Sequence, residues 1–537
     1  SQLSMSMYNK KFLILVLALV IVVSFIFYFV TKPDSYNKDD LYENKIADHN
    51  QNYSNKNYGV ATNNPIAQRV GEKIINDGGN AVDAAIGVSY ALAVTEPHSS
   101  GIGGGGAMLT YDGKENDEPN QYQYKDISSY DYKQGDQIGT PGFVKGMHEV
   151  HDKEGKMDEK EILNRVIPLA KDGFEIDSEL ERSLKLFGDK IDRDTPFFND
   201  EKTKRQGDVV KQPELAKTLE GIRDHGPDYF YDKVGKSISK QLDDKLTEKD
   251  FKDYKPEQKD PVSTTYLNNK VYSASNPLGG TLMLQGLKID ESVNDSPTLN
   301  DRDDFIQNII DARDLMYRNR DIVNGNDADY SQYLSQDYIS GELQKIKAGN
   351  GFDNSFSNDI ETMSTTHFVV IDKQGKMAST TNTLSSFFGS GKFMKEGFYM
   401  NDSLSNFSKS EASPNHGEPH KQPRSFTAPS IVVGPDFYLG IGTPGGNKIP
   451  TTENEVLIDY LRGQGTLQQS IDKPRFYNDG DTVYYENAMK KSDIETFERM
   501  GYQTEEKRND PNFGSIQAAS FNKKDKRVEI GHDVGNR

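Results

Sequence analysis

The longest apolar stretch of the chain lies close to its N-terminus. Residues 12–30 form an uninterrupted run of 19 residues that contains a single serine and no charge. A helix of about 20 apolar residues is long enough to span a hydrocarbon core of about 30 Å. Lys10 and Lys11 precede the run, so the positive-inside rule places residues 1–11 in the cytoplasm and the body of the chain outside the cell.

A cleaved signal peptide is the alternative interpretation of this run. The run is longer than the apolar part of a typical signal peptide, and it ends in Phe-Tyr-Phe-Val-Thr-Lys-Pro, without the small residues of a cleavage site. The chain contains no cysteine, which excludes a lipoprotein anchor. We therefore expect a single-pass transmembrane signal anchor at the cell membrane, with an extracellular catalytic domain.

Polar residues after the run predict a flexible tether and then the start of the fold. Residues 31–57 are rich in Asn, Asp, Lys and Tyr and carry too few apolar residues to bury a core. Order is expected to begin near Tyr58. Asn64-Pro65 then predicts a helix start, and the apolar stripe that follows stops at Gly78. Residues 81–94 are almost wholly apolar and predict a buried helix.

From residue 365 onwards the pattern changes to short β-branched and aromatic runs between turn residues. Six such runs predict strands, over residues 367–371, 377–383, 397–400, 430–433, 437–441 and 482–485. The preceding residues 323–360 are polar with few core formers and predict an exposed linker. Strands concentrated in this part, with helices on both sides, favour a layered α+β fold over a doubly wound one.

Composition narrows the function classes. The chain has 537 residues, with 64 basic and 83 acidic side chains and a net charge of -19. This balance describes a soluble body and argues against a nucleic-acid groove as the main surface. The absence of cysteine excludes disulfides, thiolate zinc sites and cysteine nucleophiles.

Two glycine-rich segments have the letters of nucleotide-binding motifs but the wrong context. Residues 101–106 match G-x-G-x-x-G, yet a predicted buried helix precedes them and a strand follows, the reverse of the dinucleotide fingerprint. Gly391-Lys392 resembles the end of a phosphate loop, but Ser386 stands where that loop requires glycine. Both segments are better explained as tight turns and packing points.

Two threonines and two glycines form a candidate for acyl chemistry. Thr365 begins a β-branched run, and Thr383 follows one predicted hairpin later. A hydroxyl is a poor nucleophile without a base, but a chain cut before Thr365 would supply its new α-amine, with a pKa of about 8. Gly445 and Gly446 follow a predicted strand and could turn two backbone N–H groups toward one oxyanion. Each feature alone also fits an ordinary strand threonine or an ordinary turn.

The joint order of five motifs resembles the γ-glutamyltransferase family. The motifs are Gly-Ile-Gly-Gly-Gly-Gly at 101–106, Thr-Pro-Gly-Phe-Val at 140–144, Ser-Thr-Thr-His-Phe at 364–368, Thr-Leu at 383–384 with Phe-Gly-Ser-Gly at 388–391, and Thr-Pro-Gly-Gly-Asn at 443–447. The resemblance runs from about Tyr58 to the C-terminus. It implies an N-terminal nucleophile hydrolase: an αββα sandwich of two stacked antiparallel sheets flanked by helices, which cuts itself before its nucleophile.

The resemblance also implies how the chain is divided. The peptide bond between Ser364 and Thr365 is the expected cleavage site, and the catalytic domain would then consist of a large subunit, residues 58–364, and a small subunit, residues 365–537. The two fragments are expected to remain associated. No metal or organic cofactor is expected.

Roles for single residues follow from the same resemblance. Thr365 is the expected nucleophile, Thr383 orients its hydroxyl, and Gly445 and Gly446 provide the oxyanion hole. Ser425, which follows Arg424, matches a serine that helps to hold the α-carboxylate of the γ-glutamyl donor.

Departures from the family pattern narrow the expected donor. Lys125 replaces an arginine of glutathione-type members, keeping the charge but losing the bidentate fork. Asn406 replaces an aspartate that grips the free α-amine of the donor, and Ser385 replaces a larger asparagine. The α-nitrogen inside a γ-linked polymer is a neutral amide, and a buried carboxylate facing it would lack a cation. These changes resemble the poly-γ-glutamate capsule depolymerase branch, which transfers capsule polymer to a cell-wall amine or to water.

Two other functions remain open from the sequence. The first is a broad-specificity γ-glutamyltransferase or glutathione hydrolase, and the second is a surface binding protein on an inactive version of the fold. Whether Arg537 at the C-terminus supplies a cationic contact to the donor also remains open.

Overall fold

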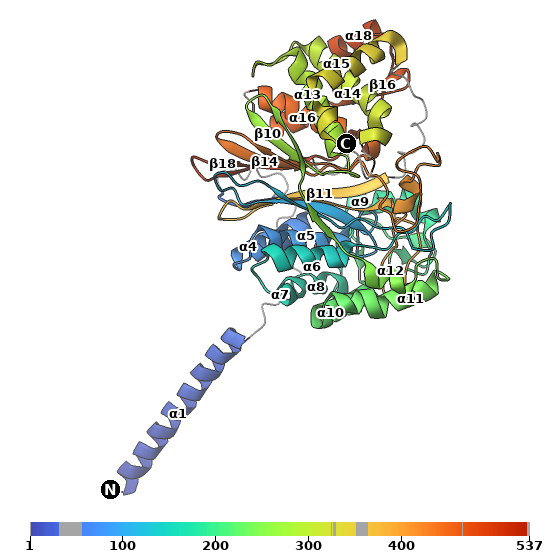
Figure 1. Cartoon of the computed structure of the whole chain (residues 1–537). Coiled ribbons are helices and arrows are strands. Elements are labelled where there is room, and N and C mark those ends of the chain that lie inside the picture. The colour runs from blue at the N-terminus through green and yellow to red at the C-terminus, as the bar shows by residue number, and fades with distance from the viewer. Residues whose placement is uncertain are drawn as a thin grey trace.

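In the computed structural model, which describes residues 2–31, 56–323, 325, 329–350, 363–463 and 465–533, two six-stranded sheets lie face to face (Figure 1). Every pair of neighbouring strands in both sheets is antiparallel. Helices cover the outer face of each sheet, which gives four layers. The predicted αββα sandwich is confirmed.

The first sheet holds the two strands on which the candidate threonines lie. Its order is β1 (Gly59–Ala61), β11 (Met363–Ile371), β12 (Met377–Ser386), β2 (Gly105–Tyr111), β3 (Asn120–Gln123) and β8 (Glu257–Lys259). The order of the second sheet is β19 (Val528–His532), β18 (Gln517–Asn522), β14 (Phe437–Gly442), β13 (Ser430–Val433), β10 (Asn269–Ser273) and β9 (Val262–Tyr266).

The helices form two outer layers (Figure 1). The layer on the first sheet contains α4 (Pro65–Asn76), α5 (Ala81–Thr95), α6 (Phe143–Glu154), α7 (Glu159–Asn164), α8 (Ile167–Lys171), α10 (Pro213–His225), α11 (Gly235–Gln241) and α12 (Glu248–Asp253). The layer on the second sheet contains α13 (Gly280–Val293), α14 (Arg302–Val323), α15 (Gln336–Lys345), α16 (Ile449–Arg462), α17 (Leu467–Asp472) and α18 (Lys491–Arg499). Beside them lie α9 (Ser178–Phe187) and a small sheet of β15 (Phe476–Asp479), β16 (Thr482–Tyr485) and β17 (Gln503–Glu506).

The inner faces of the two sheets approach closely where glycine replaces a side chain. Val369 of β11 packs between the sheets with Ile431 and Tyr438 of the second sheet. A Cβ atom at Gly442 would lie 2.3 Å from Nδ1 of His367, well inside van der Waals contact. Gly442 therefore lets β14 approach β11 beside the candidate nucleophile.

The N-terminal helices match the sequence prediction. The Asn64 side chain accepts a hydrogen bond from the Ala67 N–H at 3.0 Å and caps α4. All residues of α5 are buried, as its apolar composition predicts. A loop and then β2 follow α5, so the glycine run lies between a helix and a strand and does not have the context of a dinucleotide site.

Two sequence predictions are wrong. Residues 397–400 form no strand, because Gly397 adopts a positive φ of 96° in a tight turn and only the isolated bridge between Phe393 and Tyr399 forms. The polar stretch 323–360 is not only a linker, because it contains α15, whose Ile339 is fully buried against Leu315. Residues 324, 326–328 and 351–360 of that stretch lie outside the described residues. The other five predicted strands correspond to β11, β12, β13, β14 and β16.

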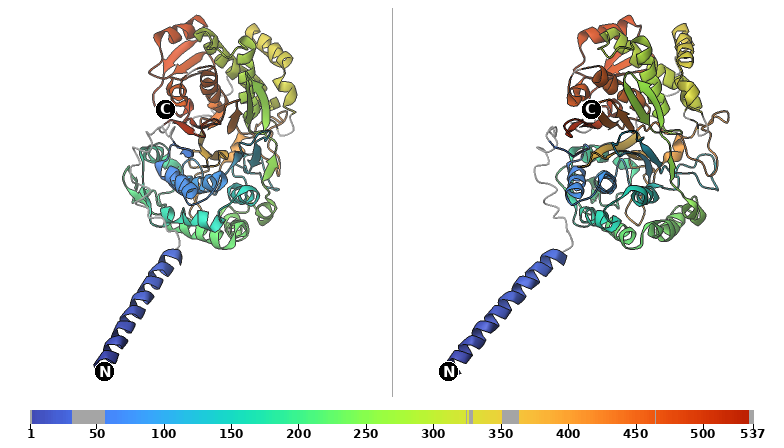
Figure 2. Two further views of the ribbon diagram at one scale, coloured as in Figure 1. Left: turned by 90° about the vertical axis from the view of Figure 1, so that its left-hand side faces the viewer. Right: turned by 60° about the vertical axis from the view of Figure 1, so that its left-hand side comes forward.

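The predicted membrane span lies within a long helix, α1 (Gln2–Thr31). Residues Ser6–Phe27 are long and apolar enough to cross a membrane by length and composition. The helix stands clear of the folded body in all views (Figures 1 and 2). Residues 32–55 of the predicted tether and Arg537 lie outside the described residues.

A buried ion pair joins two helices of the outer layer on the second sheet. Arg462 at the end of α16 donates from Nε to Asp290 Oδ2 of α13 at 2.8 Å, and both side chains are almost completely buried. The guanidinium also donates to the carbonyl oxygen of Ser296 at 2.7 Å. The second carboxylate oxygen accepts from the side-chain amide of Asn308 at 2.9 Å. The guanidinium and the carboxylate of this pair therefore both have hydrogen-bond partners besides each other.

We expect Arg462→Met to destabilise the fold strongly, because it leaves the Asp290 carboxylate buried without its cation. Breaking a buried pair in this way costs about 3–5 kcal/mol. Urea unfolding followed by circular dichroism measures the effect. The matched control is Lys473→Met, which removes an exposed pair with Asp459 and should cost less than about 1 kcal/mol. Equal midpoints for the two variants would contradict the prediction.

Candidate active site

A short hydrogen-bond chain joins Thr365, Thr383 and the backbone before Thr365. The Thr365 hydroxyl donates to Oγ1 of Thr383 at 3.0 Å, and the Thr383 hydroxyl donates to the carbonyl oxygen of Ser364 at 2.9 Å. All three residues are buried. Thr383 therefore connects the Thr365 hydroxyl to the Ser364 carbonyl, across the peptide bond that joins these two residues.

The pairing of β11 with β12 creates this arrangement. Thr365 lies opposite Thr383 and Ser364 lies opposite Ser385, with a bulge between the two pairs. The N–H of Ser385 donates to Thr383 Oγ1 at 2.8 Å. Ser385 has a φ of 82°, a left-handed conformation that is costly for a residue with a side chain. The bulge and this turned residue direct the backbone N–H back to Thr383.

The hydroxyl of Thr383 uses its full hydrogen-bonding capacity. It accepts from Thr365 and from the backbone of Ser385, and its single proton points to Ser364. A proton leaving Thr365 can therefore enter Thr383 while the proton of Thr383 moves to the carbonyl oxygen. The arrangement is able to activate Thr365 toward the carbonyl carbon of Ser364.

A second serine holds Ser364 from the other side. The hydroxyls of Ser99 and Ser364 lie 2.7 Å apart, and the Ser99 carbonyl accepts the N–H of Leu384 at 2.9 Å. Ser99 lies in the loop between α5 and β2, directly before the glycine run. Sequence reasoning missed Ser99, and its position in a Pro-His-Ser-Ser segment before that run is the signal that could have found it.

The paired glycines lie beside β11. Gly445 has a φ of 135° and Gly446 a φ of 59°, values that a residue with a side chain rarely adopts. A Cβ atom at Gly445 would meet no atom closer than 3.8 Å, so backbone conformation and not space requires glycine there. Gly446 begins a short 3₁₀ helix that packs against β11.

Two of the sequence-predicted donor residues, Ser385 and Asn406, lie near the segment that precedes Thr365. The Asn406 side-chain amide donates to Ser385 Oγ at 3.0 Å. The same serine hydroxyl approaches Met363 Sδ at 3.7 Å. In the intact chain Met363 therefore lies against the hydroxyl of Ser385 that Asn406 contacts.

Lys125 is buried close to this group. Its ammonium has no hydrogen-bond partner among the residues that the structure describes. Burial lowers the pKa of Lys125, and the nearby charges of Asp126 and Asp402 oppose that shift. A buried cation without a partner is costly, so this ammonium is suited to receive an anion.

Asp402 is a second residue that sequence reasoning did not identify. Its carboxylate accepts the N–H of Ser386 at 2.9 Å and the hydroxyl of Ser386 at 2.6 Å. Burial raises its pKa. It lies in the same run as Asn406, where an Asp next to an Asn was the available signal. Asp402 links the end of β12 to the surroundings of Lys125.

Ser425 and Arg424 are engaged elsewhere. The hydroxyl of Ser425 lies 3.1 Å from that of Thr427. The guanidinium of Arg424 pairs with Asp321 and stacks over Phe426, 5.8 Å from the ring centre. No described contact joins either residue to Thr365. The structure therefore unites Thr365, Thr383, Ser385 and Asn406 but leaves Arg424 bound to Asp321.

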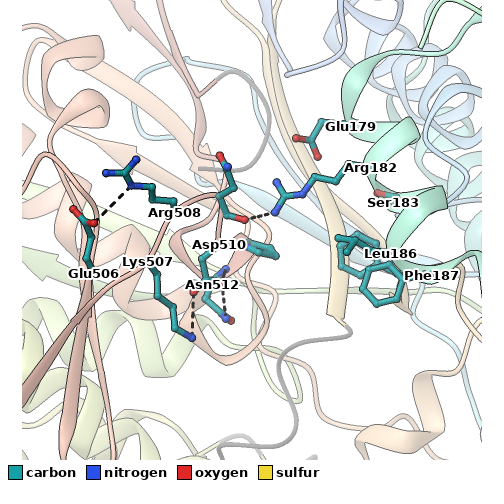
Figure 3. A pocket seen from close by; sticks show the side chains of 13 residues that line it. Glu179, Arg182, Ser183, Leu186, Phe187, Glu506, Lys507, Arg508, Asp510 and Asn512 are labelled. Atoms are coloured by element: carbon teal, nitrogen blue, oxygen red, sulfur yellow. Dashed lines mark hydrogen bonds and ion pairs between the residues drawn. The ribbon is translucent and has the colours of Figure 1, made fainter. Parts of the chain in front are cut away.

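An open cleft of about 470 Å³ lies between α9 and the loop over residues 506–512 (Figure 3). A much smaller chamber of about 20 Å³ reaches Thr365 itself. Glu179 of α9 lines both cavities. Phe387, just after β12, lines the cleft and stacks on Phe187 with ring centres 4.4 Å apart. The cleft therefore adjoins the chamber that Thr365, the candidate nucleophile, lines.

Charges of both signs line this cleft. Arg182 reaches across from α9 to donate to the carbonyl oxygen of Asn509 (Figure 3). On the opposite wall, Arg508 lies 3.6 Å from Glu506 and Lys507 lies 3.9 Å from Asp510. The cleft could therefore receive a ligand that itself carries a cation and an anion.

The two histidines of the chamber are uncharged at neutral pH. Burial lowers the pKa of His98 and of His367 to about 3. His367 Nδ1 lies 2.9 Å from the Thr381 hydroxyl. Neither imidazole supplies positive charge beside Thr365.

Comparison with known proteins identifies the family. The sequence matches the family model for gamma-glutamyltranspeptidase over residues 67–534. It is 36% identical over 476 residues to the capsule biosynthesis protein CapD proenzyme of Bacillus anthracis, covering 87% of each chain. It is 30% identical over 495 residues to the glutathione hydrolase proenzyme of Bacillus subtilis, covering 82% of this chain and 84% of that one.

A solved structure shows the same fold at lower identity. The cephalosporin acylase of Bacillus halodurans superposes with a TM-score of 0.78 at 20% identity and covers 89% of this chain and 95% of that one. The fold and the extent of the sequence match agree with one another. The chain belongs to the gamma-glutamyltranspeptidase family and is a γ-glutamyl transferase or hydrolase.

Proposed function

We propose that this protein is a self-cleaving, membrane-anchored acyltransferase that cuts poly-γ-glutamate capsule outside the cell and passes it to a cell-wall amine or to water. The observation that carries the proposal is the hydrogen-bond chain from Thr365 through Thr383 to the Ser364 carbonyl. It joins a nucleophile to a neighbouring peptide carbonyl before any substrate is present.

Self-cleavage begins with attack of Thr365 Oγ1 on the Ser364 carbonyl carbon. The Thr365 proton passes to Thr383, and the Thr383 proton passes to the carbonyl oxygen. Breaking the C–N bond then leaves an ester between Ser364 and Thr365 Oγ1 and frees the Thr365 nitrogen as an amine. Water hydrolyses the ester. The names of both relatives above contain the word proenzyme, which supports this step.

The sheet order explains why the fragments would stay together. In the first sheet β11 and β12 of the small fragment lie between β1 and β2 of the large one. In the second sheet β13 of the small fragment pairs with β10 of the large one. A cut at Ser364 breaks one peptide bond and leaves these ladders of hydrogen bonds in place.

The mature enzyme would use the freed amine as its base. The Thr365 α-amine, with a pKa of about 8, takes the proton of Oγ1, directly or through water, while Oγ1 attacks the γ-carbonyl of the donor. The N–H groups of Gly445 and Gly446 would stabilise the oxyanion, and removal of one such donor typically costs about 100- to 1000-fold in rate. An amine or water then releases the acyl group from Thr365.

The donor residues favour an internal unit of a γ-linked polymer. Departure of Met363 would uncover the Ser385 hydroxyl that Asn406 contacts, and the buried ammonium of Lys125 interacts with Asp402 of the same segment as Asn406. That ammonium would pair with an α-carboxylate, and the neutral Asn406 would face the amide nitrogen. The B. anthracis relative is named as a capsule biosynthesis protein, whereas the B. subtilis relative is named as a glutathione hydrolase.

The cleft between α9 and residues 506–512 would admit the acceptor. An amine that attacks the acyl-enzyme has to approach Thr365 from a side that the donor leaves open. Glu179 can attract an ammonium group, and Arg182 can bind a carboxylate on the same acceptor. A cell-wall amine that stands beside a carboxylate has both charges.

The apolar helix α1 would hold the enzyme at the membrane. Its residues Ser6–Phe27 meet the length and hydropathy of a span. Lys10 and Lys11 lie close to its N-terminal end, which places the catalytic domain outside by the positive-inside rule. This position would bring the active site to capsule and cell wall.

The purified wild-type chain is expected to run as two bands on a denaturing gel, and Thr365→Ala as one. The smaller band should begin at Thr365 and contain 173 residues, the difference 537 − 364. N-terminal sequencing of this band checks the position of the cut. Thr380→Ala, which removes a buried hydroxyl from the neighbouring strand β12, is the control and should still be cut. A fully active wild type that stays in one band would rule out the mechanism.

Asn406→Asp should shift donor preference toward substrates with a free α-amine. The new carboxylate would attract an ammonium but face an amide without a cation, so the kcat/KM ratio of a γ-glutamyl anilide to polymer should rise about 10-fold or more, the size of one charge-assisted hydrogen bond. Release of anilide and of polymer fragments measures the two rates. Asn199→Asp, on an exposed hairpin, is the control for added charge. An unchanged ratio would contradict the proposal that polymer is the donor and would favour a glutathione-type donor.

Arg182→Gln should weaken binding of the acceptor and leave the reaction of the donor unchanged. Loss of one charge-assisted contact should raise the acceptor KM about 10-fold, while hydrolysis of a γ-glutamyl anilide without acceptor stays within about twofold. A diamino acid serves as acceptor, and the ratio of transfer to hydrolysis is measured. Arg193→Gln, in an exposed pair with Glu201, is the control. Equal acceptor KM values for both variants would exclude this cleft as the acceptor site.

A further inference from the structure

We propose that Glu96 donates the proton that the Thr365 nitrogen takes up when self-cleavage breaks the Ser364–Thr365 bond. The proton would travel across the small chamber beside β11 through one water molecule. This role rests on the self-cleavage proposed above and assigns to it a residue outside the threonine pair.

The chamber lies at an edge of β11 that no strand covers. β1 pairs with β11 only from Val369 to Ile371, so the edge at Thr365 and Thr366 extends beyond β1. The chamber occupies this position and measures about 20 Å³. A cavity of at least about 10–15 Å³ on this measure can hold a water molecule if polar groups surround it. The polar residues that line it are Asn63, Glu96, His98, Ser99, Glu179, Thr365, Thr366, His367, Ser515 and Gln517.

Glu96 is held next to the scissile bond. It caps the C-terminal end of α5, where its N–H donates to the Leu92 carbonyl. Its carboxyl oxygen Oε2 lies 3.3 Å from the side-chain nitrogen of Asn64, and its carboxyl group also bonds the Thr366 side chain. Thr366 directly follows the residue whose nitrogen is released. One water in the chamber can therefore contact both Glu96 and Thr365.

The surroundings of Glu96 favour its protonated form. Burial raises the pKa of Glu96 to about 8, and the charges of Asp177 and Glu179 add to that shift, while hydrogen bonds from Asn64 and Thr366 oppose it. The imidazoles of His98 and His367, which share the chamber, are neutral. At neutral pH the carboxyl group therefore carries a proton that it can donate.

The chemistry of the cut requires such a donor. The relay through Thr383 yields a neutral adduct in which the former carbonyl oxygen of Ser364 carries a hydroxyl. An amide nitrogen leaves poorly as an anion, so it has to be protonated as the C–N bond breaks. Glu96 supplies this proton. The adduct hydroxyl releases its proton through water to the Glu96 carboxylate, which restores the acid and leaves an ester and a free amine.

The test compares self-cleavage rates of newly synthesised full-length chains. Glu96→Gln keeps the shape but removes the acidic proton and should slow the cut at least 10-fold, while Glu96→Asp should recover part of the rate. In the wild type the rate should fall as pH rises through about 8, because the acid is lost, and Glu96→Gln should lack this limb. The matched control is Glu453→Gln, which changes another fully buried glutamate, bonded to Ser430, and should be cut at the wild-type rate.

Hydroxylamine shows whether Glu96 acts in the formation of the ester or in its hydrolysis. It cleaves an accumulated ester rapidly, so it should leave Glu96→Gln slow if the ester fails to form. Two results for Glu96→Gln would overturn the assignment. The first is fast cutting in the presence of hydroxylamine. The second is cutting in the absence of hydroxylamine at the wild-type rate and with the wild-type pH profile. A wild-type chain that is never cut between Ser364 and Thr365 would instead overturn the proposed function. Circular dichroism of Glu96→Gln against uncut Thr365→Ala checks the fold, and the wild-type pH limb tests Glu96 without any substitution.

Discussion

The antiparallel pairing of β11 with β12 is the constraint on which the candidate site depends. It places Thr365 opposite Thr383, and the bulge beside them brings the Ser364 carbonyl within reach of the same hydroxyl. A register shift of one residue would turn every side chain of β11 to the opposite face. The register is held because β11 is buried on both faces, by α5 on one side and by the second sheet on the other.

Burial on both faces also explains why a cut inside this sheet is compatible with the fold. The proposed cleavage site lies at the start of β11, and each sheet contains strands from both sides of it. The apolar side chains of β11, such as Phe368 and Val369, stay packed in two separate cores whether or not the chain is continuous. The free energy of unfolding therefore depends on packing contacts that do not require an intact peptide bond between Ser364 and Thr365.

Local signals predicted much of this architecture. Caps and apolar periodicity identified α4 and α5, and alternation with turn residues identified β11, β12, β13, β14 and β16. Helix α15 was not predicted, because Ile339 is its one fully buried apolar side chain, while Tyr338 and Leu343 pack only partly against the same core and the other neighbours are polar. Ser99 and Asp402 were missed because each contacts β12 through the tertiary fold, and no local sequence pattern shows these contacts. The pairing of Arg424 with Asp321, 103 residues away, could not be predicted either, because nothing in the segment around Arg424 reveals it.

Electrostatics connect the fold to the proposed substrate. A chain with a net charge of -19 repels a polyanion at long range, although salt screens this repulsion beyond about 8–10 Å. Recognition then depends on cations placed where solvent does not screen them. Lys125 is such a cation, because its ammonium is buried without a hydrogen-bond partner among the described residues. Folding already removes water from this ammonium, which costs free energy. Pairing with the carboxylate of a donor would offset that cost when the donor binds. Selectivity for an anionic donor can thus arise inside an acidic protein.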